Sequence, residues 1–115
     1  SASHYVALCL GGQARVALEA GEEDRAVELI LASFGRSSDT ASSLDGLNIS
    51  TVDTAKMTRA RLIESKNEEP LARLEAALAS LDPKHLELPA YEERGPTPPQ
   101  RGQRGQGGRG RQRGN

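Results

Sequence analysis

The sequence predicts an all-α protein, a small helical bundle of about four helices in two helical hairpins, with a disordered C-terminal tail. Apolar residues recur at helical spacing in four segments. The chain has no Trp, one Phe and two Tyr, so a core must come mainly from Leu, Ile, Val and Ala. With 115 residues it supports one small domain. We assign residues 1–94 to this domain, 95–100 to a Pro-rich linker and 101–115 to the tail.

The first hairpin is predicted from helices over about residues 3–20 and 22–34. Gly11 and Gly12 are expected to weaken or kink the first helix, and Gly21 ends it. The second helix has three carboxylates in its first turn, where they favour the helix dipole, and Gly35 as a stop signal. Its apolar residues at helical spacing are Ala26, Val27, Ile30, Leu31 and Phe34.

Residues 13–34, QARVALEAGEEDRAVELILASF, resemble a tetratricopeptide helix pair. Ala14, Gly21, Ala26 and Ile30 fall where that family has small, glycine, alanine and bulky residues. The resemblance implies a helical hairpin that binds a protein partner.

A flexible loop is expected over residues 36–48, because Ser, Asp, Thr and Gly are frequent there and no periodicity survives. Ser50, with Asp53 three residues later, forms a variant of the capping box and starts a third helix over residues 51–66. On a helical wheel, apolar residues share one face with three cations. These are Val52, Ala55, Leu62 and Ile63 with Lys56, Arg59 and Lys66.

This mixed face has two interpretations. The three cations can lie along a nucleic-acid backbone and hold its phosphates. Alternatively, their stems flank an apolar seam with the charges in water, neutralised by Glu64, Glu68 and Glu69.

Asn67 is expected to cap a fourth helix over residues 68–82, which Asp82-Pro83 ends. A seam of leucines runs along this helix at spacings of three and four, namely Leu71, Leu74, Leu78 and Leu81. So short a seam must pack on the first hairpin or on the same seam of a second copy, so it is a docking or homodimer surface. Residues 84–94 are expected to form a strap whose Leu86, Leu88 and Tyr91 cover the edge of the core.

The tail, residues 101–115, has no apolar and no acidic residue. Guanidinium groups bind phosphate bidentately, which makes its five arginines candidate nucleic-acid contacts. They are Arg101, Arg104, Arg109, Arg111 and Arg113. All sixteen carboxylates lie in residues 1–100, which carry a net charge of −6 against +5 for the tail. The tail resembles the RG-rich tails of RNA-binding proteins. Because it has no aromatic residue, we expect charge-driven binding without base readout.

We find no catalytic constellation and no metal or cofactor motif. His4 and His85 lie at opposite ends of the chain, and Cys9 alone does not complete a metal site. An ordinary surface His and a buried Cys are expected instead. No apolar run is long enough to cross a membrane. A single Cys favours an intracellular protein, cytoplasmic or nuclear.

These observations predict a non-enzymatic RNA-binding or nucleic-acid-binding protein whose Arg-Gly tail contacts phosphates. A viral RNA-handling protein, or the C-terminal module of an RNA-processing protein, fits this description. The alternative is a tetratricopeptide-like adaptor that binds a helical protein partner and has an incidental basic tail. The expected partners are RNA or another polyanion, a second copy or a helical protein, and no membrane.

Overall fold

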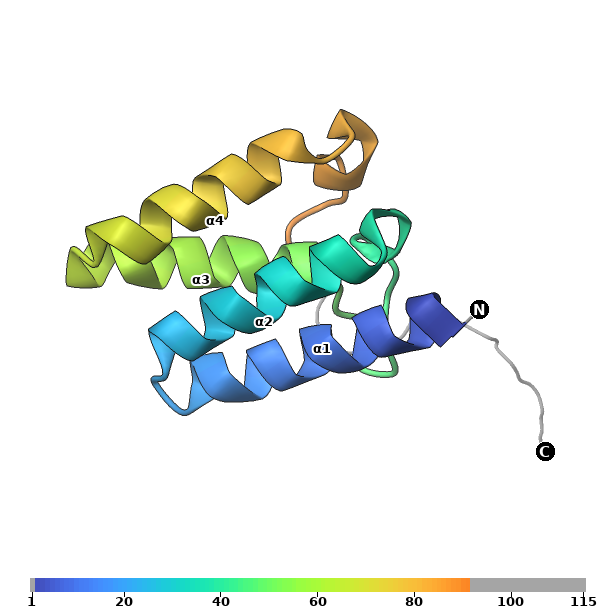
Figure 1. The fold of residues 1–115 in the computed structure, drawn as a ribbon, viewed down its shortest axis with the longest axis horizontal. Coiled ribbons are helices and arrows are strands. Elements are labelled where there is room, and N and C mark those ends of the chain that lie inside the picture. Colours follow the sequence, from blue (N-terminus) through green and yellow to red (C-terminus); the bar gives the residue numbers. More distant parts are fainter. Residues whose placement is uncertain (1, 92–115) are drawn as a thin grey trace, which may run out of the picture.

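The computed structural model describes residues 2–91, which fold into four α-helices and two short 3-10 helices. The α-helices are α1 (Ala2–Glu19), α2 (Glu23–Arg36), α3 (Thr51–Ser65) and α4 (Glu68–Ser80), shown in Figure 1. The 3-10 helices are η1 (Ser38–Thr40) and η2 (Pro83–Leu86). No strand occurs among these residues, so the all-α prediction is confirmed, and each α-helix begins and ends within two residues of its predicted bounds.

The first hairpin consists of α1 and α2, which run antiparallel and are joined at Gly21, whose φ of 81° suits a residue without a side chain. Small residues let the two helices pack closely, and Ser33 Oγ donates a 2.8 Å hydrogen bond to the carbonyl oxygen of Ala7. The stop predicted at Gly35 is wrong. Instead, α2 continues to Arg36 and ends where Ser37 adopts an extended conformation.

Gly11 serves for packing and does not interrupt α1. The helix continues through Gly11 and Gly12 as one element. A Cβ added to Gly11 would lie 2.0 Å from Thr51 Oγ1, whereas one added to Gly12 would meet nothing within 4 Å. Gly11 therefore permits the start of α3 to approach the middle of α1.

The connection between the hairpins is packed against the helices, which corrects the prediction of a featureless flexible loop. It contains η1, and Thr40, Ala41 and Asn48 are all buried. The amide of Val52 donates to the Ala41 carbonyl oxygen, which ties the connection to the start of α3. Such contacts leave no sequence periodicity because they belong to neither a helix nor a strand.

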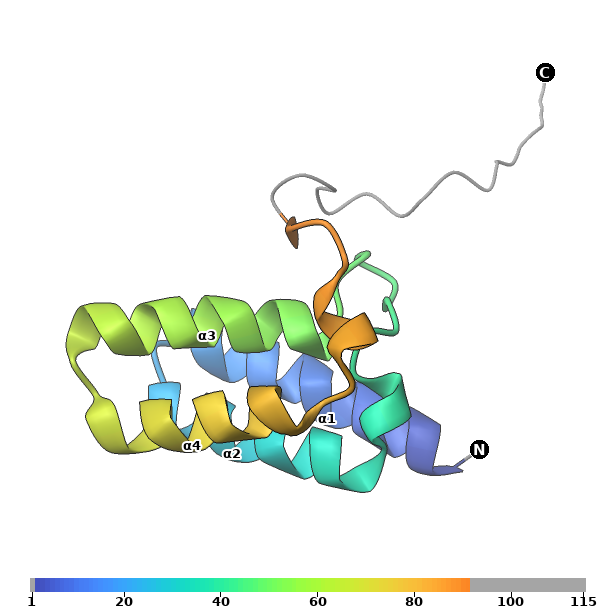
Figure 2. The same ribbon diagram turned by 90° about the horizontal axis from the view of Figure 1, so that it is seen from above.

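The capping box at the start of α3 is confirmed. Ser50 Oγ accepts from the Asp53 amide at 3.0 Å, and the Asp53 carboxylate accepts from the Ser50 amide at 2.7 Å. Asn67 occupies the N-cap position of α4, but its side chain makes no capping hydrogen bond. It donates to Asp24 Oδ1 at 2.7 Å instead, which joins the turns of the two hairpins at one end of the bundle (Figure 2).

The leucine seam of α4 packs on the first hairpin, the first of the two alternatives open to it. Leu74, Leu78 and Leu81 are buried in the core with apolar residues of α2 and α3, while Leu71 is partly buried against that core. The core residues of the other two helices are Val27, Ile30, Phe34, Val52, Ala55 and Leu62. Three of the four leucines are thus buried within a single chain, and the fourth is partly buried there.

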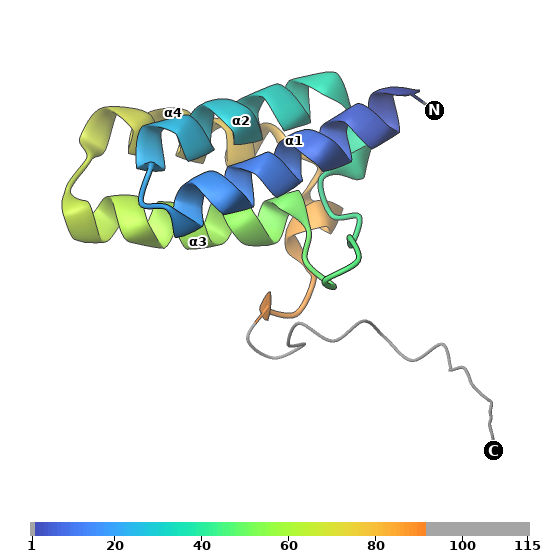
Figure 3. The same ribbon diagram turned by 90° about the horizontal axis from the view of Figure 1, so that it is seen from below.

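The segment after α4 forms η2 and covers the edge of the core, as the strap prediction requires of Leu86. His85 is buried, and its Nδ1 lies 2.8 Å from Ser42 Oγ of the inter-hairpin connection. In Figure 3 the strap and this connection lie at the end of the bundle away from the two hairpin turns. Within residues 2–91, every helix is too short or too polar to cross a membrane.

Candidate nucleic-acid interface

The five arginines of the tail, with the linker before them, lie outside the residues that the structure describes. Their predicted contacts with phosphate therefore stay a prediction. The described chain ends at Tyr91, which is part of the strap and lines a groove on the surface of the bundle.

The structure does not gather the predicted basic stripe of α3 into one surface. Lys56 is partly buried and lines the groove, whereas Arg59 and Lys66 are exposed and lie outside it. Lys66 is the C-cap residue of α3 and adopts a left-handed conformation there. Ile63, assigned to the apolar part of the stripe, is 56% exposed. In the part of the chain that is described, the three cations make no ion pair with the neighbouring glutamates.

The groove lies between α1 and α3 and has a volume of about 440 Å³. One face of α3 forms a wall, with residues at helical spacing from Asp53 to Arg61. The end of α1 forms the opposite wall, and the inter-hairpin connection and the strap complete the lining. Apolar side chains provide most of the floor, namely Leu18, Leu47, Ile49, Met57 and Ala60.

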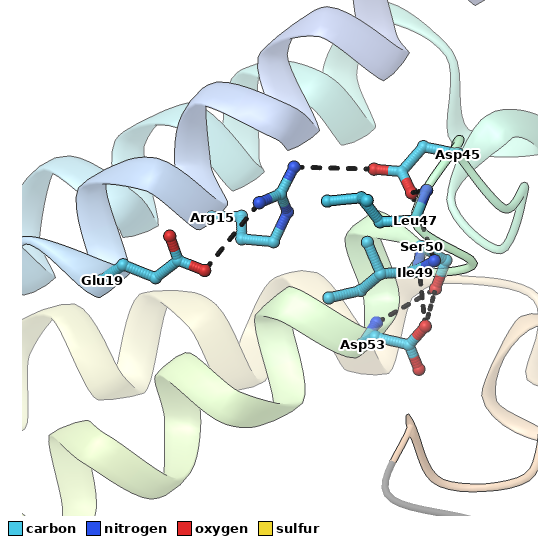
Figure 4. A network of polar contacts seen from close by, with 7 residues as sticks. All are labelled: Arg15, Glu19, Asp45, Leu47, Ile49, Ser50 and Asp53. Atoms are coloured by element: carbon cyan, nitrogen blue, oxygen red, sulfur yellow. Dashed lines mark hydrogen bonds and ion pairs between the residues drawn. The ribbon is translucent and has the colours of Figure 1, made fainter. Parts of the chain in front are cut away.

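Arg15 enters the groove from α1 and is held by two carboxylates. Its guanidinium nitrogens lie 3.8 Å from Glu19 and 3.8 Å from Asp45, as Figure 4 shows. Asp45 also accepts hydrogen bonds from the Leu47 and Ile49 amides, so the same carboxylate shapes the loop beside the groove. Arg15 Nε is buried and has no hydrogen-bond partner within residues 2–91.

Two further cations line the groove from α3, and neither is paired with a carboxylate among the described residues. Lys56 Nζ donates to the carbonyl oxygen of Leu86 at 3.3 Å, and Arg61 Nη1 donates to that of Leu18 at 3.5 Å. Because a carbonyl oxygen carries no formal charge, it does not neutralise the positive charge of either donor. Both side chains therefore remain able to bind an anion.

The groove also contains Asp53 and Glu19, and each of these carboxylates already interacts with another side chain or with the main chain. The Asp53 carboxylate is buried and accepts from both the amide and the hydroxyl of Ser50. Glu19 is 67% exposed and faces Arg15. With Asp45, which pairs with Arg15 from the loop beside the groove, three carboxylates balance three cations, and of these cations only Lys56 and Arg61 have no carboxylate partner among the described residues.

The cysteine and the two histidines are the other candidate reactive side chains of residues 2–91. Cys9 is exposed, which corrects the expectation that it is buried, and His85 is buried where a surface His was expected. His4 Nδ1 lies 3.0 Å from Thr40 Oγ1. In the described range, no three His, Cys, Asp or Glu side chains lie close enough together to hold a metal ion.

Comparison with known proteins gives no relative. No family model, no curated protein and no solved structure matches the chain. The resemblance of residues 13–34 to a tetratricopeptide pair stays a prediction.

Sequence reasoning missed Arg15 and Arg61 as members of the site. A signal for Arg61 exists, because Asp53, Lys56, Met57, Ala60 and Arg61 share the spacing of one helix face. Arg15 has no such signal, since the inter-hairpin connection that brings Asp45 to it has no regular pattern.

Proposed function

We propose that this protein binds RNA, or nucleic acid more generally, without catalysis, and that its Arg-Gly tail supplies most of the affinity. The observation that carries the proposal is the segregation of charge, with five arginines and no carboxylate in residues 101–115 against a net charge of −6 in residues 1–100. Neutralising phosphates releases counterions, which gives affinity without sequence readout.

The arrangement of the helices supports different roles for the bundle and the tail. The buried apolar residues of the described chain all lie between Ala7 and Leu81, and they form the core of the bundle. The described chain then ends at the rim of the groove that Lys56 and Arg61 line. A strand held by the tail is therefore bound within reach of two cations that have no carboxylate partner among residues 2–91.

A salt titration tests the proposal. The full chain is compared with a variant in which the five tail arginines are replaced by Gln, using a single-stranded RNA and a duplex of equal length. Five contacts on a single strand predict a slope of log K against log salt of about −3.5, so raising salt from about 50 to 200 mM costs on the order of 100-fold. The variant should lose this slope.

The matched control is a variant with five arginines or lysines of the bundle replaced, chosen outside the groove. Arg25, Arg36, Arg59, Lys66 and Lys84 are exposed and lie outside it. This variant has the same net charge as the tail variant. If both variants lose affinity equally, overall charge governs binding and the tail has no special role.

A protein-interaction adaptor is the second candidate, and the outer face of α1 favours it. Tyr5, Cys9, Val16 and Ala20 are exposed and fall on one side of that helix. Apolar exposure of this kind marks protein contacts when it is contiguous. This candidate predicts a partner whose binding survives replacement of the tail arginines and is lost in Tyr5→Ser/Val16→Ser.

A further inference from the structure

The groove between α1 and α3 has the size and the chemistry of a ligand site. Its volume of about 440 Å³ lies within the range of small-molecule pockets in proteins. Its floor is apolar, and its cations stand at the edges. A ligand that fits must combine a flat apolar part with a compact anion.

We infer that this groove binds one nucleotide unit, with the phosphate held by Lys56 and Arg61 and the base on the apolar floor. The inference deepens the proposed function, on which its biological meaning rests. Lys56 and Arg61 are about 7.5 Å apart along the axis of α3 and about 140° apart around it, with Lys56 reaching toward the strap and Arg61 toward α1, so a phosphate held by both must lie between them. Both now donate only to main-chain carbonyls within residues 2–91, so phosphate oxygens offer them stronger acceptors.

Arg15 fits the same ligand from the opposite wall. Its buried Nε has a hydrogen available, because no acceptor reaches it among residues 2–91. Its two terminal nitrogens are oriented by Glu19 and Asp45, so the guanidinium plane is fixed beside Leu47. The exposed part of the Arg15 side chain, 21% of its surface, is the part that a base edge or a ribose oxygen in the groove can reach.

The floor of the groove suits a base better than it suits an acidic peptide. Leu47, Met57 and Ala60 offer exposed apolar surface above the buried Leu18 and Ile49, and residues 2–91 contain no strand whose edge could bind an extended peptide. Tyr91, at the rim, adds an aromatic ring, and single-stranded nucleic acid is bound by such rings through stacking. The first tail arginine, Arg101, is ten residues beyond Tyr91 in the chain, so a strand that the tail holds stays within reach of this rim.

The test uses the full chain, with amide chemical shifts in two-dimensional NMR as the readout. Adenosine 5′-monophosphate is titrated in, beside adenosine and inorganic phosphate separately. The nucleotide should shift the amides of Leu18, Leu47 and Ala60, and each fragment alone should shift them less at equal concentration. Shifts that concentrate elsewhere on the bundle would overturn the inference.

Two matched variants of α3 distinguish binding in the groove from a general effect of positive charge. Lys56→Gln/Arg61→Gln removes the two groove cations of α3, and Arg59→Gln/Lys66→Gln removes two cations of the same helix that lie outside the groove. Loss of two charge-assisted contacts should weaken nucleotide binding about tenfold or more in the first variant and leave it unchanged in the second. Equal weakening in both would overturn the site. The NMR spectrum of each variant reports whether it is folded.

Two arms distinguish failure of the site from failure of the proposed function. The variant without tail arginines should keep its nucleotide shifts, because the groove belongs to the bundle. If the full chain binds no RNA but keeps those shifts, RNA binding is refuted and the nucleotide site stands. A Glu-rich peptide that displaces the nucleotide and shifts the same amides as strongly would overturn the inference in favour of an acidic protein partner.

Discussion

Replacing Gly11 by Ala tests whether the close approach of α1 to α3 fixes the geometry of the bundle and its groove. The added Cβ would lie 2.0 Å from Thr51 Oγ1 and 3.1 Å from Thr51 Cβ. Rotation of Thr51 gives no relief, because its side chain is β-branched and buried, and the methyl group would take the place of the hydroxyl. The helices must separate, or α3 must shift along α1.

Gly12→Ala is a matched control one residue away in the same helix, since its added Cβ would meet nothing within 4 Å. Both changes gain about 1 kcal/mol of helix propensity, so the difference in stability between the two variants isolates the clash. Overpacking of this kind costs about 1–3 kcal/mol. Gly11→Ala should therefore unfold about 1–3 kcal/mol more easily than Gly12→Ala.

The measurement is urea unfolding of the full chain followed by circular dichroism, supported by thermal unfolding. In a domain of this size each kcal/mol corresponds to about 4–8 °C in Tm. Adding Thr51→Ala to Gly11→Ala removes Oγ1, the atom at 2.0 Å, and leaves only Cβ at 3.1 Å, so most of the difference should be recovered in the double-mutant cycle. If Gly11→Ala is as stable as Gly12→Ala, the helices do not touch at this point and the argument is refuted.

Three further predictions concern the cap, the core and a surface pair. Ser50→Ala removes the hydroxyl that caps α3 and should cost about 0.5–2 kcal/mol in the same urea assay; no loss would refute the capping role. Leu74→Ala empties a fully buried site and should cost about 2–5 kcal/mol, whereas Ile63→Ala, at an exposed position, should change stability by less than about 0.5 kcal/mol. The hydrogen bond and charge of Arg73 lower the pKa of Glu28, so the stabilisation by this pair is present above the ordinary pKa of Glu and is lost as pH falls through the lowered one. Arg73→Ala should return the pKa of Glu28 toward its ordinary value in an NMR pH titration, and an unchanged pKa would contradict the pairing.

The helices were predictable because their signals are local. The capping box of Ser50 and Asp53 and the leucine spacing of α4 act between residues that are close in the sequence, so the sequence of each helix is enough to predict it. Gly11 shows where local reasoning fails. Its low helix propensity predicts a kink, yet the residue is explained by Thr51, which lies forty positions later in the chain.

The groove was not predictable for the same reason. Its membership depends on how α1 and α3 cross and on where the inter-hairpin connection runs. Arg15 is held in the groove by Glu19 of its own helix and by Asp45 of that connection, and the second of these contacts has no signal in the sequence. Of the three predicted cations only Lys56 lines the groove, because the helical wheel that grouped Arg59 and Lys66 with it ignores which part of α3 its neighbours cover.

The tail is expected to contribute more to RNA affinity than the groove does. Because the two are covalently linked, the groove still contributes. Arg101 is ten residues beyond Tyr91, so the two are at most about 35 Å apart. A strand bound to the tail is thereby confined near the groove at an effective concentration on the order of millimolar. A groove with only millimolar affinity for a free nucleotide would then be substantially occupied by the captured strand. Replacing Lys56 and Arg61 should consequently lower RNA affinity by a modest factor, whereas replacing the tail arginines removes both the capture and the confinement.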